Sequence, residues 1–134
     1  MKTFIDTNIF LYAAGKPHPQ RDGCVRVLRK VAGGSLDAAV NSEVIQEILY
    51  VLWRRGRSED ALTLASHVCS LFPDMLPVTR GDMKKACELL RLYPKLPVRD
   101  AIHAATMTQN GIHQIISVDT DFDQIEGIRR IEPR

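Results

Sequence analysis

The stretch Thr3-Phe-Ile-Asp-Thr-Asn8 does most to decide the fold class of this 134-residue chain. Its first residues are β-branched or aromatic, and polar residues follow from Asp6 onward. This pattern predicts a short buried strand over residues 3–6 that delivers Asp6 to a turn and the next helix. Asp6 therefore stands at the carboxyl end of a strand, where open parallel sheets bind their ligands.

Outward from this stretch, strand patterns alternate with helical ones. Short apolar runs predict four more strands, at residues 36–40, 75–78, 114–118 and 128–131. Apolar residues at helical spacing predict helices near residues 20–32, 42–55, 58–72, 80–90 and 99–110. This alternation implies an α/β fold, with a parallel sheet flanked by helices on both faces. Because the length suits one domain and no repeat or linker interrupts the chain, we expect a single domain over residues 1–134.

Two of the helix starts carry capping signals. Either Asn41 or Ser42 is a suitable N-cap for the helix at residues 42–55. Thr79 and Asp82 have the spacing of a capping box before the next-to-last helix, with Asp in place of the usual Glu or Gln. These signals fix where the two helices should begin.

Composition excludes several classes of protein. The chain is 45% hydrophobic and 25% charged, as is ordinary for a globular protein, and its formal net charge of +2 is too small to indicate nucleic-acid binding by itself. The cysteines Cys24, Cys69 and Cys87 form no CxxC pair and fall on apolar helical stripes, which predicts buried core residues rather than zinc or redox sites. No signal peptide is evident, and polar residues interrupt the long uncharged stretch 101–118. We therefore expect a cytoplasmic protein without a membrane span.

Four acidic residues occupy positions that suit a common site. Asp6 and Asp119 each follow an apolar strand, Asp100 opens a helix after a proline-rich join, and Glu47 lies at the margin of an apolar helix face. Converging carboxylates without matching basic residues repel one another and raise one another's pKa, which a divalent cation relieves. Oxygen ligands of this kind suit Mg²⁺ or Mn²⁺, which can activate water and stabilise charge on a phosphate. The pattern predicts metal-dependent phosphodiester hydrolysis.

Other candidate residues have two interpretations. Asp121 either contacts a metal or a water molecule, or only braces the turn after Asp119. His103, one turn after Asp100, is able to reach the same region, although a partly buried structural histidine is favoured. The cations Arg54, Arg55 and Arg57 end a helix, where they complement its dipole, and a solvated helix end is favoured over an RNA clamp.

Four segments, in this order and spacing, resemble the successive motifs of PIN-domain ribonucleases. They are Phe4–Phe10, Asn41–Ile48, Arg99–Ala105 and Ile116–Phe122. The resemblance implies a PIN-like fold with a central five-stranded parallel sheet, and RNA cleavage that depends on Mg²⁺ or Mn²⁺. It assigns catalysis and metal binding to Asp6, Glu47, Asp100 and Asp119, with Asp121 as an additional metal ligand. It also makes Asn8 and Ser117 supporting residues, because Asn8 takes the position that steadies the first aspartate and Ser117 that of a hydroxyl often supplied by Thr.

The chain looks most like the VapC-type toxins of toxin–antitoxin systems. That likeness implies an endoribonuclease that forms a homodimer and pairs with a cognate antitoxin, which lays a helix or extended segment across the active-site groove. Tyr50 and Trp53 extend the helix that carries Glu47 beyond its apolar stripe. Local packing and a dimer or antitoxin contact explain these two aromatic residues equally well.

Three other functions fit parts of the pattern. A non-catalytic RNA- or protein-binding module of the same fold would keep the acidic pocket only as architecture. A haloacid-dehalogenase-type phosphatase has a DxD element like Asp119-Thr-Asp121, but after its first strand and without a following Phe122. A receiver domain needs a lysine at the end of a late strand, which this chain lacks.

Overall fold

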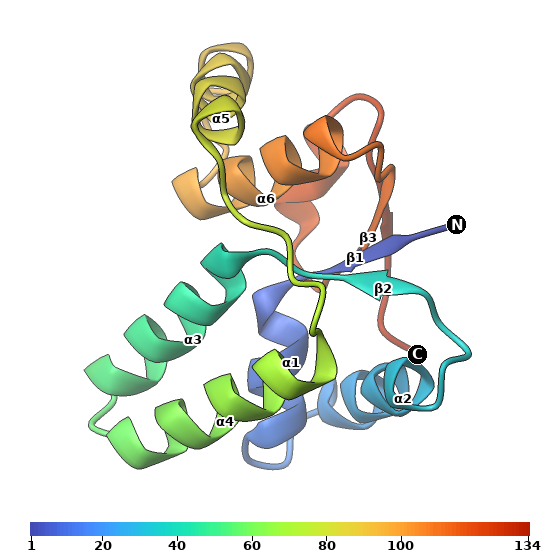
Figure 1. Ribbon diagram of the computed structural model, residues 1–134, viewed down its shortest axis with the longest axis vertical. Coiled ribbons are helices and arrows are strands. Elements are labelled where there is room, and N and C mark those ends of the chain that lie inside the picture. The colour runs from blue at the N-terminus through green and yellow to red at the C-terminus, as the bar shows by residue number, and fades with distance from the viewer.

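Four short parallel strands form the centre of the computed structural model, which describes residues 1–134 (Figure 1). They are β1 (Thr3–Ile5), β2 (Ala38–Ala39), β3 (Gln114–Ile116) and β4 (Arg129–Ile131). The strand order is β2-β1-β3-β4, so β1 and β3 are central, with Phe4 opposite Ile115 and Ile5 opposite Ile116. Every residue of β1 is buried, as expected for a parallel strand that is covered on both faces.

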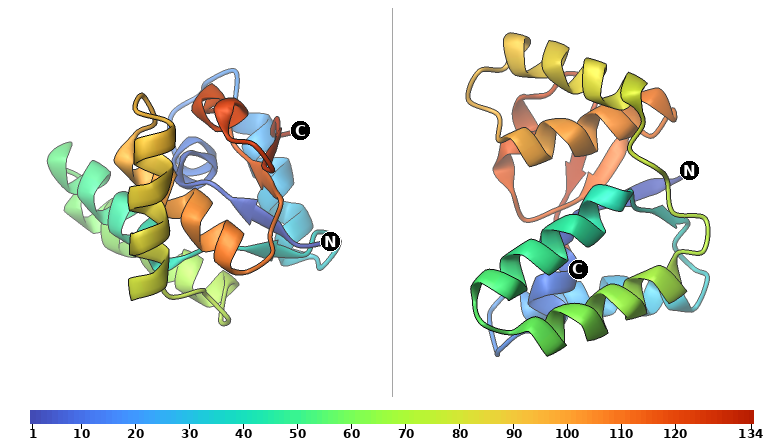
Figure 2. Two further views of the ribbon diagram at one scale, coloured as in Figure 1. Left: turned by 90° about the horizontal axis from the view of Figure 1, so that it is seen from above. Right: turned by 60° about the vertical axis from the view of Figure 1, so that its left-hand side comes forward.

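Helices cover both faces of this sheet. They are α1 (Thr7–Ala14), α2 (Arg21–Ala32), α3 (Ser42–Arg54), α4 (Ser58–Leu71), α5 (Arg80–Leu92), α6 (Val98–Gln109) and the 3₁₀ helix η1 (Thr120–Gln124). Figures 1 and 2 show the pair α5 and α6 on one side of the sheet, and α1, α2 and the antiparallel pair α3 and α4 on the other. This arrangement confirms the predicted α/β fold.

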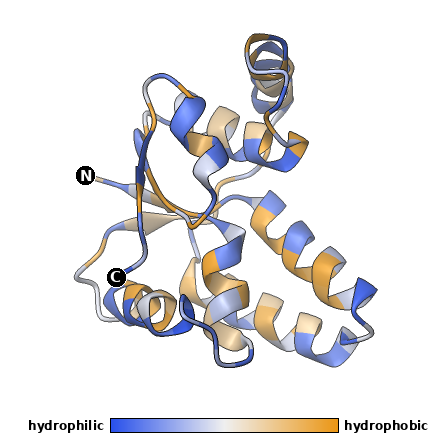
Figure 3. Cartoon of the chain, turned by 180° about the vertical axis from the view of Figure 1, so that it is seen from behind, coloured by the Kyte–Doolittle hydropathy of each residue, from blue (hydrophilic) through white to orange (hydrophobic).

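One hydrophobic core runs through the sheet and its covering helices. It includes Phe4, Phe10, Ile115 and Phe122, all essentially without solvent exposure. In Figure 3 the central strands and the inward sides of the helices carry the most hydrophobic residues. The strands that end at the candidate site are therefore held rigidly from both sides.

Both predicted capping signals are present in the structure. Asn41 is the N-cap of α3, because its Oδ1 accepts a hydrogen bond from the amide of Val44 at 3.2 Å. Thr79 and Asp82 form a complete capping box at the start of α5, with each side chain accepting from the other residue's amide. These caps set the positions of two helices that border the site.

The sheet has four strands, so the prediction of a fifth strand at residues 75–78 is wrong. Leu76 makes only one parallel bridge, in which its amide donates to Val40 and its carbonyl accepts from Ser42. The ladder stops there because α3 begins at Ser42, so the next amide of the segment, that of Val78, donates to the Ser42 hydroxyl instead of to a strand carbonyl. The segment borders the sheet without becoming part of it.

The expectation of three buried cysteines is wrong for two of them. Cys24 is buried, whereas Cys69 and Cys87 are exposed. On α4 the buried positions are Ala61, Ala65 and Val68, a narrow stripe, and Cys69 lies one residue beyond it. The apolar stripe in the sequence is thus wider than the face that the helix buries.

No helix has both the length and the apolar character that a membrane crossing requires.

Candidate active site

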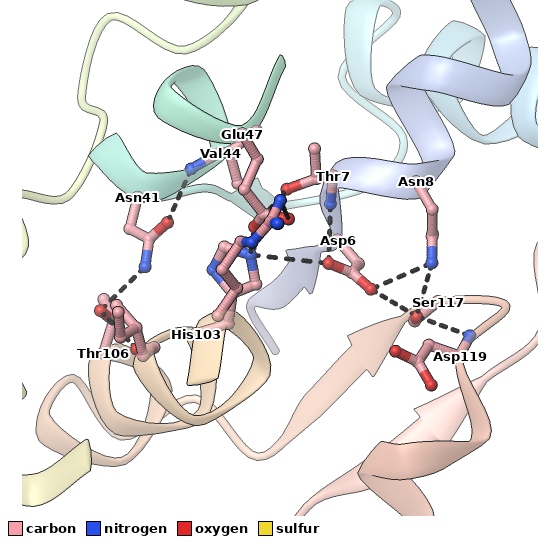
Figure 4. A network of polar contacts seen from close by, with 12 residues as sticks. Asp6, Thr7, Asn8, Asn41, Val44, Glu47, His103, Thr106, Ser117 and Asp119 are labelled. Carbon is pink, nitrogen blue, oxygen red and sulfur yellow. Dashed lines mark hydrogen bonds and ion pairs between the residues drawn. The ribbon is translucent and has the colours of Figure 1, made fainter. Parts of the chain in front are cut away.

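Asp6 lies immediately after β1 and is held through both of its carboxylate oxygens (Figure 4). It is the N-cap of α1, and its Oδ1 accepts a hydrogen bond from the amide of Thr7 at 2.8 Å. Its Oδ2 accepts from the Ser117 hydroxyl at 2.6 Å and from the Asn8 amide group at 3.2 Å. The side chain is buried, so its orientation is fixed by Thr7, Asn8 and Ser117 together.

Glu47 reaches toward Asp6 from α3 and meets His103, which projects from α6. The imidazole Nε2 of His103 donates to Glu47 Oε1 at 2.5 Å and lies 3.6 Å from Asp6 Oδ1. Thr7 Oγ1 donates to the same Glu47 oxygen at 3.0 Å. Ligand atoms of Asp6, Glu47 and His103 all lie within 4.8 Å of one another, and we call these three residues the Asp6 group.

Asp100, Asp119 and Asp121 form a second set, the Asp100 group, whose ligand atoms also lie within 4.8 Å of one another. Asp119 follows β3 and caps η1, accepting a hydrogen bond from the Asp121 amide at 2.9 Å. Asp100 is buried in the first turn of α6, and its Oδ2 has no hydrogen-bonding partner. The predicted acids therefore gather in two adjacent sets rather than in one.

Ser117 connects the two groups. Its hydroxyl donates to Asp6 and accepts from the amide of Asp119 at 2.9 Å. The charges of Asp6, Asp119 and Glu47 all raise the pKa of Asp100, so the carboxylates of both groups interact. Electrostatically the two groups form one cluster.

Burial and mutual repulsion perturb these acids strongly. Desolvation, the hydrogen bond with Asp119 and the surrounding negative charges raise the pKa of Asp100 to about 9. Burial also raises the pKa of Asp6, although the neighbouring His103 partly offsets it. Burial acts to raise the pKa of Asp119 as well, but hydrogen bonds from Asp100 and Asp121 outweigh it and lower that pKa. Asp100 and Asp119 therefore share a proton at neutral pH, with the proton held on Asp100.

His103 lies against the carboxylates of both Asp6 and Glu47. Its complete burial lowers its pKa, but the hydrogen bond to Glu47 and the charges of Asp6 and Glu47 dominate and raise it. The imidazole Nε2 thus lies between two carboxylates that favour its protonated form. The sequence favoured a partly buried structural role for this residue, whereas the structure buries it completely and places it against two site carboxylates.

A divalent cation fits the Asp100 group. Asp100 supplies a buried carboxylate oxygen that has no hydrogen-bonding partner. The bases near the cluster form ion pairs outside the Asp100 group, His103 and Arg99 with Glu47 and Arg130 with Asp123 and Glu132. Three carboxylates and the adjacent Asp6 offer the hard oxygen donors that Mg²⁺ and Mn²⁺ prefer. A cation there would replace the shared proton and offset the repulsion that raises the pKa of Asp100.

Polar residues whose contacts the sequence patterns did not predict hold the helices of the site together. Asn41 Nδ2 donates to Thr106 Oγ1 at 2.9 Å, and Thr106 Oγ1 donates to Asp82 Oδ2 at 3.1 Å. This buried chain joins the starts of α3 and α5 to α6, and so fixes Glu47 relative to Asp100. Only Asn41 and Asp82 gave a signal, as helix caps, and Thr7 gave none.

Comparisons with known proteins agree with this geometry. The family model described as PIN domain matches residues 3–128. "Ribonuclease VapC13" of Mycobacterium tuberculosis is 31% identical over 127 residues, which are 95% of this chain and 97% of that protein. "Ribonuclease VapC7" of the same species is 30% identical, covering 96% of this chain and 90% of that protein. A chain from the crystal structure of VapBC2 from Rickettsia felis, bound to a DNA fragment from the promoter, matches with a TM-score of 0.77 over 98% of both chains at 19% identity.

Proposed function

The chain belongs to the PIN domain family, and from this premise we propose that it is a metal-dependent endoribonuclease, the toxin of a type II toxin–antitoxin pair. Two relatives that are 31% and 30% identical over nearly the whole chain carry the name ribonuclease. The metal dependence rests on a single observation, the Asp100 carboxyl group with its unpartnered buried oxygen and a pKa of about 9. A group in that state is stabilised by a cation among its neighbouring acids.

In this proposal Asp6, Asp100 and Asp119 hold Mg²⁺ or Mn²⁺, Asp121 adds a ligand, and Glu47 approaches from α3. A cation held there would supply an acidified water molecule and would stabilise negative charge on the scissile phosphate. Hydrolysis adds the water oxygen to phosphorus and breaks one phosphorus–oxygen bond of the RNA backbone, and the leaving oxygen takes up a proton.

The surrounding residues prepare this chemistry by fixing the acids. Ser117 and Asn8 hold one oxygen of Asp6, while Thr7 and His103 hold one oxygen of Glu47. Because these donors restrict the side chains before any ligand arrives, little reorganisation is needed on binding. Partners of this kind support metal ligands by fixing their orientation.

We propose three biological consequences of this assignment. The substrate is RNA, a cognate antitoxin covers the site, and the protein acts in the cytoplasm, where it would meet both. Trp53, 55% exposed near the end of α3, supports a homodimer or antitoxin contact, since an exposed tryptophan is often part of an interface. Light scattering of the purified chain tests the homodimer, and a monomeric mass at all concentrations would contradict it.

The decisive experiment for the function is an RNA cleavage assay with the purified chain. We expect cleavage with Mg²⁺ or Mn²⁺ and none in EDTA. Turnover of p-nitrophenyl phosphate without RNA cleavage would indicate a phosphatase instead. RNA binding without cleavage in any divalent metal would indicate a non-catalytic binding module of the same fold.

A further inference from the structure

Two arginine side chains and one tyrosine ring form an array beside Glu47. The guanidinium carbon of Arg54 lies 5.4 Å from the centroid of the Tyr50 ring, and that of Arg99 lies 5.2 Å from it. Arg54 also donates a hydrogen bond to the Tyr50 hydroxyl at 2.8 Å. The array joins α3 to the first turn of α6, two elements that pack against each other.

Arg54 and Arg99 form few ion pairs with carboxylates. Arg54 forms no ion pair, and the only partner of Arg99 is Glu47, at 3.7 Å. In contrast, Arg57, from the same basic run as Arg54, is paired with Asp60 at 2.8 Å. The two guanidiniums of the array thus keep hydrogen-bond donors available for an anion.

The ring restricts where the two guanidiniums point. Cation–π contact limits the freedom of long arginine side chains, and a guanidinium presents its donors in a planar fork that matches a phosphate group. Guanidinium planes and aromatic rings are also the groups on which unpaired RNA bases stack. An exposed array of this composition has the chemistry of a subsite for single-stranded RNA.

Its location connects the array to the cluster of acids. Arg99 directly precedes Asp100 in the chain, and Tyr50 lies three residues after Glu47 on α3. Arg99 is about half exposed, so a ligand that approaches the acids from solvent can contact it. An RNA strand with one phosphate at the acids would pass this array with a neighbouring nucleotide.

We propose that Tyr50, Arg54 and Arg99 form a nucleotide-binding subsite for single-stranded RNA beside the cleavage site. The two arginines bind the phosphate of a nucleotide next to the scissile bond, and Tyr50 positions them. This inference rests on the proposed ribonuclease function and adds the residues that hold the strand.

The test is binding of a labelled single-stranded RNA, measured by fluorescence anisotropy in EDTA so that no cleavage occurs. We expect Arg54→Ala and Arg99→Ala each to weaken binding by about tenfold, as for lost charge-assisted hydrogen bonds. Loss of the phosphate contact in the double variant should reduce the slope of log affinity against log salt by about 0.7, and each single variant should reduce it by less. Tyr50→Phe should weaken binding less than Tyr50→Ala, because it keeps the ring.

A matched control is Arg26→Ala, which removes an exposed arginine from α2, outside the α3–α6 face. It should leave affinity and salt slope near the wild-type values. In Mn²⁺, the variants of the array should raise KM for RNA more than they lower kcat, and calorimetry should show no weaker Mn²⁺ binding.

Two results would overturn the subsite. The first is that the wild-type protein cleaves RNA, yet the double variant Arg54→Ala/Arg99→Ala binds RNA with the wild-type affinity and salt slope. The other is a lowered melting temperature with an unchanged slope, which would mean that the array only joins α3 to α6. If the wild type itself cleaves no RNA in any metal, the proposed function fails instead, and the salt slopes still report on the subsite.

Discussion

The Asp6 group and the Asp100 group contain similar acids, but they differ in how their carboxylates are compensated. Every carboxylate oxygen of Asp6 and Glu47 faces a hydrogen-bond donor or a basic group, and the buried imidazole of His103 lies between the two side chains. In the Asp100 group one buried oxygen has no partner, and a proton shared with Asp119 relieves the repulsion. The protein thus fixes the first group by itself, whereas the second needs a proton or a cation.

The largest expected effect is loss of activity when the Asp100 group loses a charge. Asp100→Asn and Asp119→Asn keep the shape of the side chain but weaken cation binding. Because a metal supplies several kcal/mol of charge stabilisation in the transition state and about 1.4 kcal/mol is tenfold in rate, we expect Mn²⁺-dependent RNA cleavage to fall by more than about 100-fold. Rates of RNA cleavage in saturating Mn²⁺ measure this.

The matched control for that experiment is Asp123→Asn. Asp123 lies in η1 close in sequence to Asp119 and Asp121, but it is paired with Arg130 at 2.8 Å. This variant should keep cleavage near the wild-type rate, and all three variants should keep the wild-type circular dichroism spectrum. An Asp100→Asn protein that cleaves RNA like the wild type would remove the basis for treating the Asp100 group as the metal site.

The second expected effect is a dependence of stability on pH in EDTA. The pKa of Asp100 rises from the ordinary 3.8 to about 9 on folding, so the folded protein holds a proton that the unfolded chain releases. This contribution to stability is complete below pH 3.8 and is lost as pH rises toward about 9, and the raised pKa values of Asp6 and His103 act in the same direction. The melting temperature should therefore fall as pH rises across this window.

Two further measurements sharpen this prediction. Asp100→Asn should melt at a temperature that depends less on pH, because the asparagine does not titrate. Saturating Mn²⁺ should raise the melting temperature of the wild type, most of all at high pH, since a cation takes the place of the shared proton. A wild-type melting temperature that rises with pH in EDTA would contradict the assignment of the shared proton to Asp100.

Local sequence patterns were sufficient to predict most of the framework. An apolar run followed by a polar turn located β1 and β3, and with them Asp6 and Asp119 at the carboxyl ends of central strands. The capping signals located the starts of α3 and α5. The fifth strand failed because α3 begins at Ser42 and ends the backbone pairing with residues 75–78, which the apolar run in those residues does not show.

The partners of the acids were harder to predict, because they depend on contacts between distant residues. Glu47 and His103 are separated by 56 residues, and their hydrogen bond follows from the direct contact between α3 and α6. The same packing divides the acids into two groups, which the spacing of the motifs does not show. Burial of Cys69 could not be judged either, because the pattern gives the apolar stripe but not the width of the buried face.

The third expected effect concerns His103, which belongs to the group that the protein fixes by itself. His103→Leu fills the buried space but removes the donor to Glu47 Oε1 and the imidazole beside Asp6. Groups that orient metal ligands typically contribute 10- to 100-fold to metal affinity or activity, and we expect a loss of about that size. Mn²⁺ calorimetry and cleavage rates measure it, and His103→Gln should recover part of the loss by keeping a donor.

A His103→Leu protein with wild-type Mn²⁺ affinity and cleavage would mean that the hydrogen bond to Glu47 serves stability alone. Only the Asp100 group would then be needed to explain metal binding and cleavage. A melting curve for each variant in EDTA shows whether the fold tolerates the change.

The smallest expected effect is that of Thr7→Val, which removes only the second donor to Glu47 Oε1. Valine has nearly the same shape, and the backbone amide of residue 7 still donates to Asp6, so the Asp6 carboxylate should keep its orientation. One hydrogen bond contributes about 0.5–1.5 kcal/mol, so Mn²⁺-dependent cleavage should fall about two- to tenfold. Because Thr7 and His103 donate to the same oxygen, the effects of Thr7→Val and His103→Gln should not add in a double-mutant cycle. Strictly additive losses would show that the two residues act separately, and that Glu47 is not held as a unit by the Asp6 group.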